Sequence, residues 1–244
     1  MTPLLETHDL GLQAAGRWLL RGLDWQVLPG QRWCVIGRNA AGKSTLLRAL
    51  AGLGVPQRQG AVAWQGRDQA GWSALDAASA RAYAPQHLVD RFALSVTRLL
   101  ALSRVNAQAP SAAGLLAALD ASHLAERNIT ELSGGERQRV ALAQCAAQGA
   151  PLWLLDEPVS FQDPAHQGLV AQWLTRSAPA DGASAWVASA HDVNWIARSA
   201  THVLALYGEG RWTAGPCADM LNAELLRQVY GCDWREAAGV WVPI

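Results

Sequence analysis

The sequence has little lysine, cysteine and phenylalanine, and no excess of charge of either sign. Its 244 residues include 20 Lys and Arg against 20 Asp and Glu, so the formal net charge is zero. A chain without a basic or acidic excess does not favour nucleic acid or an anionic membrane surface as its main partner. We therefore expect no binding to nucleic acid.

Cysteines and long apolar runs are also scarce. The four cysteines are widely separated and form neither a Cys-x-x-Cys pair nor a spacing with histidine typical of zinc sites. The N-terminal segment has no basic start followed by an apolar core, and no run of about 18 apolar residues occurs. These absences predict a cytoplasmic chain that is neither secreted nor able to span a membrane by itself.

The order of hydrophobic patterns predicts an α/β fold with a mostly parallel sheet, because strand patterns alternate with helical patterns. An antiparallel pair over residues 4–28 precedes this core, and a helical insert interrupts it. Half of the chain is hydrophobic, which is enough for a large core. Further strands are predicted at 33–36, 60–64, 81–84, 152–155, 185–189, 203–207 and 211–213, and helices at 45–51, 134–148 and 164–176. The range 95–126 is predicted to form two main helices separated at Pro110 and Ser111, with Ser111 as a cap, and the range 217–230 to form short helices.

One glycine-rich stretch has the spacing of a phosphate-binding loop. It follows an apolar strand and leads into a helix, which is the context that the motif requires. Glycines let the backbone approach an anion, and the amides at the helix start point towards it. The motif comprises Gly37, Arg38, Asn39, Ala40, Ala41, Gly42, Lys43, Ser44 and Thr45.

Lys43 is the only lysine of the chain, so the other nineteen of the twenty basic residues are arginine. A lysine ammonium is compact and flexible, whereas a guanidinium is a planar fork. Lys43 is therefore predicted to reach the outer phosphates of a nucleotide, and Ser44 to hold Mg²⁺.

A second motif places two carboxylates, Asp156 and Glu157, after the apolar strand 152–155. Ligands bind at this end of the strands in open α/β sheets. Asp156 can bind Mg²⁺, and Glu157 can accept a proton from an attacking water. The alternative is an acidic strand end before a turn.

A third motif, Leu132-Ser-Gly-Gly-Glu136, begins a helix. Ser133 and Glu136 have the spacing of a capping box, which would explain these two residues alone. Gly134 and Gly135 lower helix propensity in the first turn and leave amides exposed at the positive end of the helix dipole. A second anion-binding helix start is the better interpretation.

These motifs, in this order, resemble the ATP-binding cassette (ABC) ATPases over essentially the whole chain, as a single domain with a helical insert at about 87–132. The resemblance implies ATP and Mg²⁺ as cofactors and a head-to-tail pair of cassettes, in which Ser133, Gly134 and Gly135 touch the γ-phosphate held by the second copy. It also implies nucleotide binding by the phosphate loop and Asp163, metal binding by Ser44, Gln86 and Asp156, and catalytic roles for Glu157, His191 and Gln86. Without the resemblance, Gln86 is an ordinary loop glutamine and His191 a surface histidine.

Three residues depart from the family pattern. Ala40 stands where a second glycine is usual, and Gln162 stands where leucine is usual. Ala14 occupies the position of the aromatic residue that stacks on the base. Trp18 could substitute for that aromatic, but its place before two leucines favours packing.

Residues 72–86 and 223–231 resemble the cassettes of importers for iron-siderophore, haem and cobalamin. This resemblance implies a peripheral ATPase at the cytoplasmic face of the inner membrane, with transmembrane permease subunits and a substrate-binding protein as partners. An exporter of lipid or lipoprotein is the nearest alternative. A DNA-repair ATPase would need a long coiled coil between Lys43 and Ser133, and no sustained heptads occur there. A translation factor would carry two cassettes on one chain.

Overall fold

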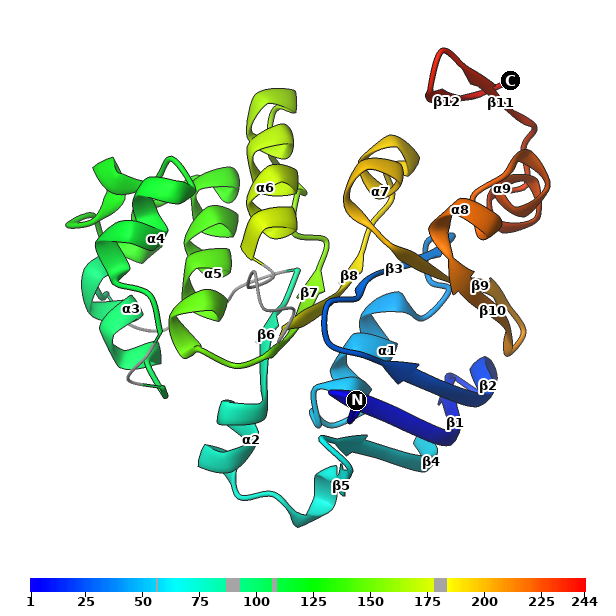
Figure 1. Cartoon of the computed structure of the whole chain (residues 1–244), viewed down its shortest axis with the longest axis horizontal. Helices are drawn as coiled ribbons and strands as arrows, with labels where there is room; N and C mark the ends of the chain where they lie inside the picture. Colours follow the sequence, from blue (N-terminus) through cyan, green and yellow to red (C-terminus); the bar gives the residue numbers. More distant parts are fainter. Residues whose placement is uncertain (56, 87–92, 107–108, 178–183) are drawn as a thin grey trace.

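The computed structural model describes residues 1–55, 57–86, 93–106, 109–177 and 184–244. A six-stranded sheet forms its centre, in the order β10-β9-β3-β8-β7-β6 (Figure 1). The neighbours from β9 to β6 are parallel, and β10 pairs antiparallel with β9. The strands are β3 (Arg32–Gly37), β6 (Arg81–Ala84), β7 (Leu152–Asp156), β8 (Ala185–Ser189), β9 (His202–Gly208) and β10 (Arg211–Pro216).

A second, antiparallel sheet has the order β2-β1-β4-β5 and lies beside the first (Figure 1). The predicted pair over 4–28 is confirmed, with Ala15 and Gly16 forming its turn at positive φ. The strands are β1 (Leu5–Ala14), β2 (Arg17–Val27), β4 (Gln57–Trp64) and β5 (Arg67–Asp68). The α/β class with a mostly parallel sheet and an antiparallel subdomain is thus confirmed.

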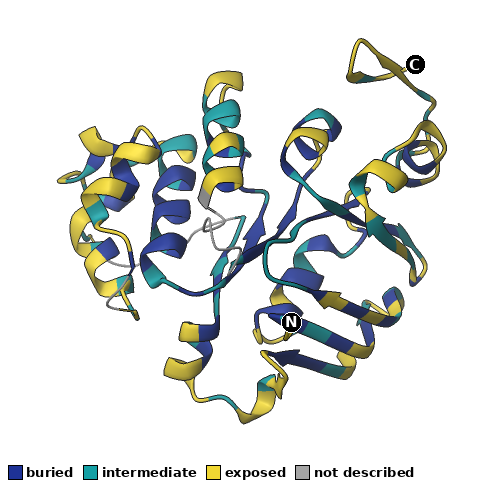
Figure 2. Ribbon diagram, viewed as in Figure 1, coloured by how far each residue is buried: buried dark blue, intermediate teal, exposed yellow. Residues whose placement is uncertain are grey.

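Helices cover both faces of the central sheet. Since side chains alternate between the two faces along each strand, each face contributes to a core of its own. In β3, Cys34 and Ile36 belong to the core under one face, whereas Trp33 and Val35 belong to the core under the other face. Figure 2 shows the central strands buried and the outer helix faces exposed. The longer helices are α1 (Lys43–Leu50), α3 (Val96–Ser103), α5 (Gly134–Gln148), α6 (Pro164–Ser177) and α9 (Ala223–Tyr230), and the shorter are α2 (Ala74–Ala80), α4 (Ala112–Ala118), α7 (Val193–Ser199) and α8 (Cys217–Met220).

The helices α3 and α4 pack against α5 on the side of the molecule away from the antiparallel sheet (Figure 1). Ser111 caps α4 as predicted, since its hydroxyl accepts a hydrogen bond from the amide of Gly114. Residues 87–92 and 107–108 of the predicted insert lie outside the described residues. The boundaries 87–132 of the insert, and the single-domain organisation, remain predictions.

The hairpin of β11 (Trp234–Ala237) and β12 (Val240–Pro243) was not predicted. Ala238 and Gly239 form its turn with φ of 51° and 77°. Two left-handed residues are typical of a tight hairpin turn, but alanine at the first of them gives a weak signal in the sequence. Among the described residues, no helix is long and apolar enough to cross a bilayer.

Candidate nucleotide site

The phosphate-loop motif lies between β3 and α1, as its sequence context predicts. A Cβ on Gly37 would lie 2.9 Å from the carbonyl oxygen of Leu206, and a Cβ on Gly42 would lie 2.8 Å from the Cβ of Leu19. Gly42 also has φ of 102°. Both glycines are therefore required by close packing, and the loop closes tightly over the start of α1. The exposed amides at this helix start favour an anion.

Lys43 lies at the mouth of this loop and is 6% exposed. Its Nζ donates hydrogen bonds to the carbonyl oxygens of Gly37 (2.9 Å) and Arg38 (3.2 Å). Burial lowers the pKa of Lys43, and the carboxylates of Glu157 and Asp156 offset part of this decrease. The ammonium is thus held beside the loop with both carboxylates near it.

Asp156 and Glu157 follow β7, and Ser189 of β8 joins them. The parallel register places Asp156 opposite Ser189. The Oγ of Ser189 donates a 2.6 Å hydrogen bond to Oδ1 of Asp156 and accepts a 2.9 Å hydrogen bond from the amide of Glu157. Asp156 is 3% exposed and Ser189 fully buried, so their positions are fixed by the sheet.

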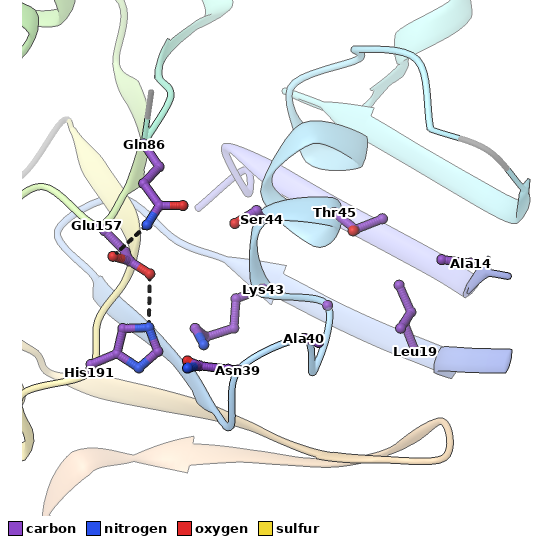
Figure 3. A pocket seen from close by; sticks show the side chains of 11 residues that line it. Ala14, Leu19, Asn39, Ala40, Lys43, Ser44, Thr45, Gln86, Glu157 and His191 are labelled. Carbon is purple, nitrogen blue, oxygen red and sulfur yellow. Dashed lines mark hydrogen bonds and ion pairs between the residues drawn. The ribbon is translucent and has the colours of Figure 1, made fainter. Parts of the chain in front are cut away.

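The Glu157 side chain receives three hydrogen bonds of 2.8 Å. Gln86 Nε2 and Ser160 Oγ donate to Oε2, and His191 Nε2 pairs with Oε1 (Figure 3). Burial raises the pKa of Glu157, but the hydrogen bonds from Ser160 and His191 and the charges of His191 and Lys43 outweigh burial and lower it overall. Its backbone has φ of 52°, a conformation that costs energy for a residue other than glycine. The structure therefore holds an ionised carboxylate in a defined position.

These groups face one cavity of about 790 Å³ (Figure 3). Its volume is in the range of cavities that hold a small-molecule cofactor. We call Asp156, Glu157 and the side chains hydrogen-bonded to them the carboxylate network. Part of this network and the phosphate loop line the cavity, together with two apolar side chains of the β1–β2 hairpin. The lining residues are Ala14, Leu19, Asn39, Ala40, Gly42, Lys43, Ser44, Thr45, Gln86, Glu157 and His191.

Two of the three residues predicted to hold Mg²⁺ line the cavity, and the third, Asp156, does not. Ser44 and Gln86 line the cavity, and the buried carboxylate of Asp156 lies close enough to Lys43 to affect its pKa. No group of three or more His, Cys, Asp or Glu side chains suited to a metal occurs in the described part of the chain. A magnesium ion needs no such cluster, since one or two protein ligands with phosphates and waters suffice. The hydroxyl and carboxylate present here fit that ion.

The third motif lies outside the cavity. The hydroxyl of Ser133 accepts from the amide of Glu136 (3.4 Å), and Glu136 Oε2 accepts from the amide of Ser133 (2.8 Å), which forms the predicted capping box. Gly134 is exposed, and a Cβ on Gly135 would lie 2.8 Å from the carbonyl oxygen of Phe161. At the start of α5, Ser133 and Gly134 are therefore exposed, whereas Gly135 packs against the backbone of Phe161.

Asp163 also lies outside the cavity lining. Its carboxylate accepts hydrogen bonds from the amide and from Nδ1 of His166, both at 2.9 Å. These hydrogen bonds lower the pKa of Asp163. Asp163 thus stabilises the first turn of α6, and its predicted role in nucleotide binding remains a prediction.

The sequence did not lead us to predict the roles of three residues in the carboxylate network. Ser160 and Ser189 hold Glu157 and Asp156, and Gln138 of α5 donates a 3.3 Å hydrogen bond to the Glu157 carbonyl. Ser160 follows Glu157 by three residues, and this short spacing could have indicated a turn contact. Ser189 and Gln138 give no local signal.

A glycine-rich loop that opens a helix, a buried lysine and two carboxylates at a strand end of an α/β sheet define a P-loop nucleoside-triphosphate hydrolase. The ABC transporter family profile matches residues 20–160, more than half of the chain. The chain therefore belongs to the ABC transporter family. It is an ATPase subunit that uses nucleotide and works with transmembrane permease subunits.

Relatives and solved structures agree with this assignment. The hemin import ATP-binding protein HmuV of Pseudomonas fluorescens is 36% identical, over 94% of this chain and 93% of the relative. The protein of the same name from Ruegeria sp. is 38% identical, over 95% of this chain and 92% of the relative. A metal-chelate type ABC transporter in an inward-facing conformation has a TM-score of 0.79 at 27% identity, covering 99% of this chain and 98% of that chain.

Proposed function

We propose that this chain hydrolyses ATP to power the import of hemin, at the cytoplasmic face of the cell membrane. The observation that carries the proposal is the match to hemin import proteins over more than nine-tenths of both chains. The likeness to a metal-chelate type transporter supports the same direction of transport. Iron-siderophore and cobalamin are chemically related substrates that the experiment below distinguishes.

The cavity supports a division of roles among its residues. The phosphate loop binds the β- and γ-phosphates through its amides, and Lys43 neutralises their charge. Ser44 and Asp156 hold Mg²⁺, with Gln86 beside them, and this ion supplies charge neutralisation at the phosphates when bound. Glu157 is the base that accepts a proton from the attacking water, because its carboxylate is ionised and held in place. His191 and Gln86 orient that carboxylate through their hydrogen bonds.

The exposed start of α5 supports a second copy of the chain as partner. Ser133, Gly134 and Gly135 have the character of an anion site but lie outside this copy's cavity. A head-to-tail pair would bring them to the γ-phosphate that the other copy holds, and Asp163 would lie at the same interface. A substrate-binding protein outside the membrane completes the proposed assembly.

The whole chain is proposed to form one cassette domain with a helical insert at about 87–132. The packing of α3 and α4 on α5 supports an insert at this place. A solved bacterial Atm1-family exporter is 24% identical to this chain, and this likeness supports the fold alone and not the alternative of an exporter.

Uptake by whole cells tests the substrate. A strain that lacks this chain is expected to lose uptake of labelled hemin and to keep uptake of ferric siderophore and cobalamin. The wild-type chain should restore hemin uptake, and Lys43→Ala should not. Loss of siderophore or cobalamin uptake instead would assign a different cargo to the same ATPase.

A further inference from the structure

One side chain joins the C-terminal hairpin to the start of α7. The Nδ2 of Asn194 donates a 3.0 Å hydrogen bond to the carbonyl oxygen of Trp241, and its Oδ1 accepts a 2.7 Å hydrogen bond from the amide of the same residue. Asn194 lies in the first turn of α7, and Trp241 lies in β12, 47 positions further along the chain. Since both ends of one side-chain amide pair with one backbone residue, the contact fixes orientation as well as distance.

The hairpin that receives this contact is itself anchored. The ring of Trp234 in β11 lies 5.6 Å from that of Tyr230 at the end of α9. Leu226 is fully buried and Val229 is 1% exposed, so α9 is fixed to the core. A two-stranded hairpin has marginal stability by itself, and α9 supplies its support. Asn194 therefore ties α7 to a fixed point outside the central sheet.

This tie lies three residues after His191. Asp192 caps α7 between them, because its Oδ1 accepts hydrogen bonds from the amides of Asn194 (2.8 Å) and Trp195 (3.1 Å). The segment from His191 to the first turn of α7 is thus one hydrogen-bonded unit. A shift of that turn carries His191 with it.

His191 depends on this backbone for its position. Its side chain is 41% exposed, so packing alone does not fix the ring. A 2.8 Å hydrogen bond joins its Nε2 to Oε1 of Glu157, the carboxylate that faces the cavity (Figure 3). Asn194 lies outside the cavity lining. It can therefore affect Glu157 through His191 without touching a nucleotide.

We propose that Asn194 is a positioning residue for ATP hydrolysis, which holds His191 beside Glu157 by tying the start of α7 to the C-terminal hairpin. The inference rests on the proposed function, in which Glu157 is the base and His191 orients its carboxylate. Loss of the tie leaves the phosphate loop in place. The chemical step therefore slows while nucleotide affinity is kept, because a small displacement of an orienting group lowers the rate more than the binding.

Kinetics of the full-length variant Asn194→Ala test the proposal. The kcat for ATP should fall by about fivefold or more, whereas KM and the dissociation constant of ADP should stay within about twofold of wild type. Asn222→Ala is the matched control. Asn222 caps α9 through a 2.9 Å hydrogen bond from the amide of Leu225, so this variant weakens the support of the same hairpin but keeps the bonds between Asn194 and Trp241. It should lower the melting temperature and keep the wild-type kcat. Equal losses of kcat in the two variants overturn the proposal.

A double variant shows whether Asn194 acts through His191. Rates are measured in single turnovers with enzyme in excess, so that slow variants are resolved. His191→Ala should lower the rate further than Asn194→Ala, and the double variant should match His191→Ala, because the tie then has no side chain to position. Losses that multiply in the double variant would show that Asn194 acts independently of His191, and the proposal would be wrong. A wild-type rate in Asn194→Ala beside an impaired His191→Ala overturns this inference alone, whereas a wild-type rate in His191→Ala contradicts the proposed role of His191 as well.

Discussion

The hydroxyl of Ser189 lies 2.6 Å from Oδ1 of Asp156, on adjacent parallel strands and fully buried. The same oxygen accepts the amide hydrogen of Glu157. One side chain of β8 thus positions the proposed metal ligand and the backbone of the proposed base. Since Glu157 has a left-handed backbone, this hydrogen bond helps to hold a conformation that the chain would otherwise avoid.

Ser189→Ala should therefore lower both stability and turnover. Loss of a buried hydrogen bond to a carboxylate costs about 1.5–3 kcal/mol of unfolding free energy. We expect a lower kcat with a smaller change in KM, measured beside urea unfolding. Ser199→Ala is the matched control, because Ser199 is equally buried and its hydroxyl has no hydrogen-bond partner in the described structure. Equal losses in both variants would contradict a positioning role for Ser189.

Local patterns predicted the phosphate loop, the capping box and most strands and helices. They succeeded because glycine spacing, hydrophobic periodicity and caps act within a few residues along the chain. The link between Asp156 and Ser189 depends on which strands become neighbours, and a single sequence does not show strand order. The ends of β7 and β8 could be predicted, but not the hydrogen bond that joins them.

The single lysine permits a direct test of the phosphate loop. An amine-reactive reagent should modify only Lys43 and the N-terminus, and ADP should protect Lys43. Lys43→Ala should abolish most nucleotide affinity in calorimetry because the phosphates lose their cation. Arg48→Ala, which removes an exposed cation one turn further along α1, should leave the affinity unchanged. Retained affinity in Lys43→Ala would contradict the assignment.

Glu157→Gln should stop turnover and still allow ATP to close the proposed dimer. The amide keeps the size of the side chain but cannot accept the proton from water. Size-exclusion chromatography should show an ATP-dependent dimer, and the double variant Lys43→Ala/Glu157→Gln should remain monomeric. A Glu157→Gln variant that hydrolyses ATP at the wild-type rate would exclude Glu157 as the base.

The pH profile should report the hydrogen bond from Ser160 to Glu157. That bond lowers the pKa of the Glu157 carboxyl, so the base stays ionised as pH falls below the usual range of a glutamate. Ser160→Ala removes the bond and raises the pKa. The acidic limb of kcat/KM should therefore move to higher pH, with activity at neutral pH less affected. Ser103→Ala, which removes a hydroxyl bonded to a helix carbonyl in α3, is the control. An unshifted acidic limb in Ser160→Ala would contradict this account.

The last prediction concerns strain in the phosphate loop. Ala40 has φ of 63°, whereas its neighbour Ala41 lies outside the left-handed region. A left-handed alanine costs roughly 1–2 kcal/mol, and a glycine adds about 0.5–1 kcal/mol of unfolded-state entropy.

Ala40→Gly should thus raise the unfolding free energy slightly, by about 0.5 kcal/mol. Ala41→Gly has the entropy cost without relief of strain, and it also removes a buried methyl group, so it should destabilise the protein by about 1.5 kcal/mol. Thermal unfolding of the two variants should therefore shift in opposite directions. If both variants lose stability equally, Ala40 is unstrained and the alanine at this position has no conformational cost.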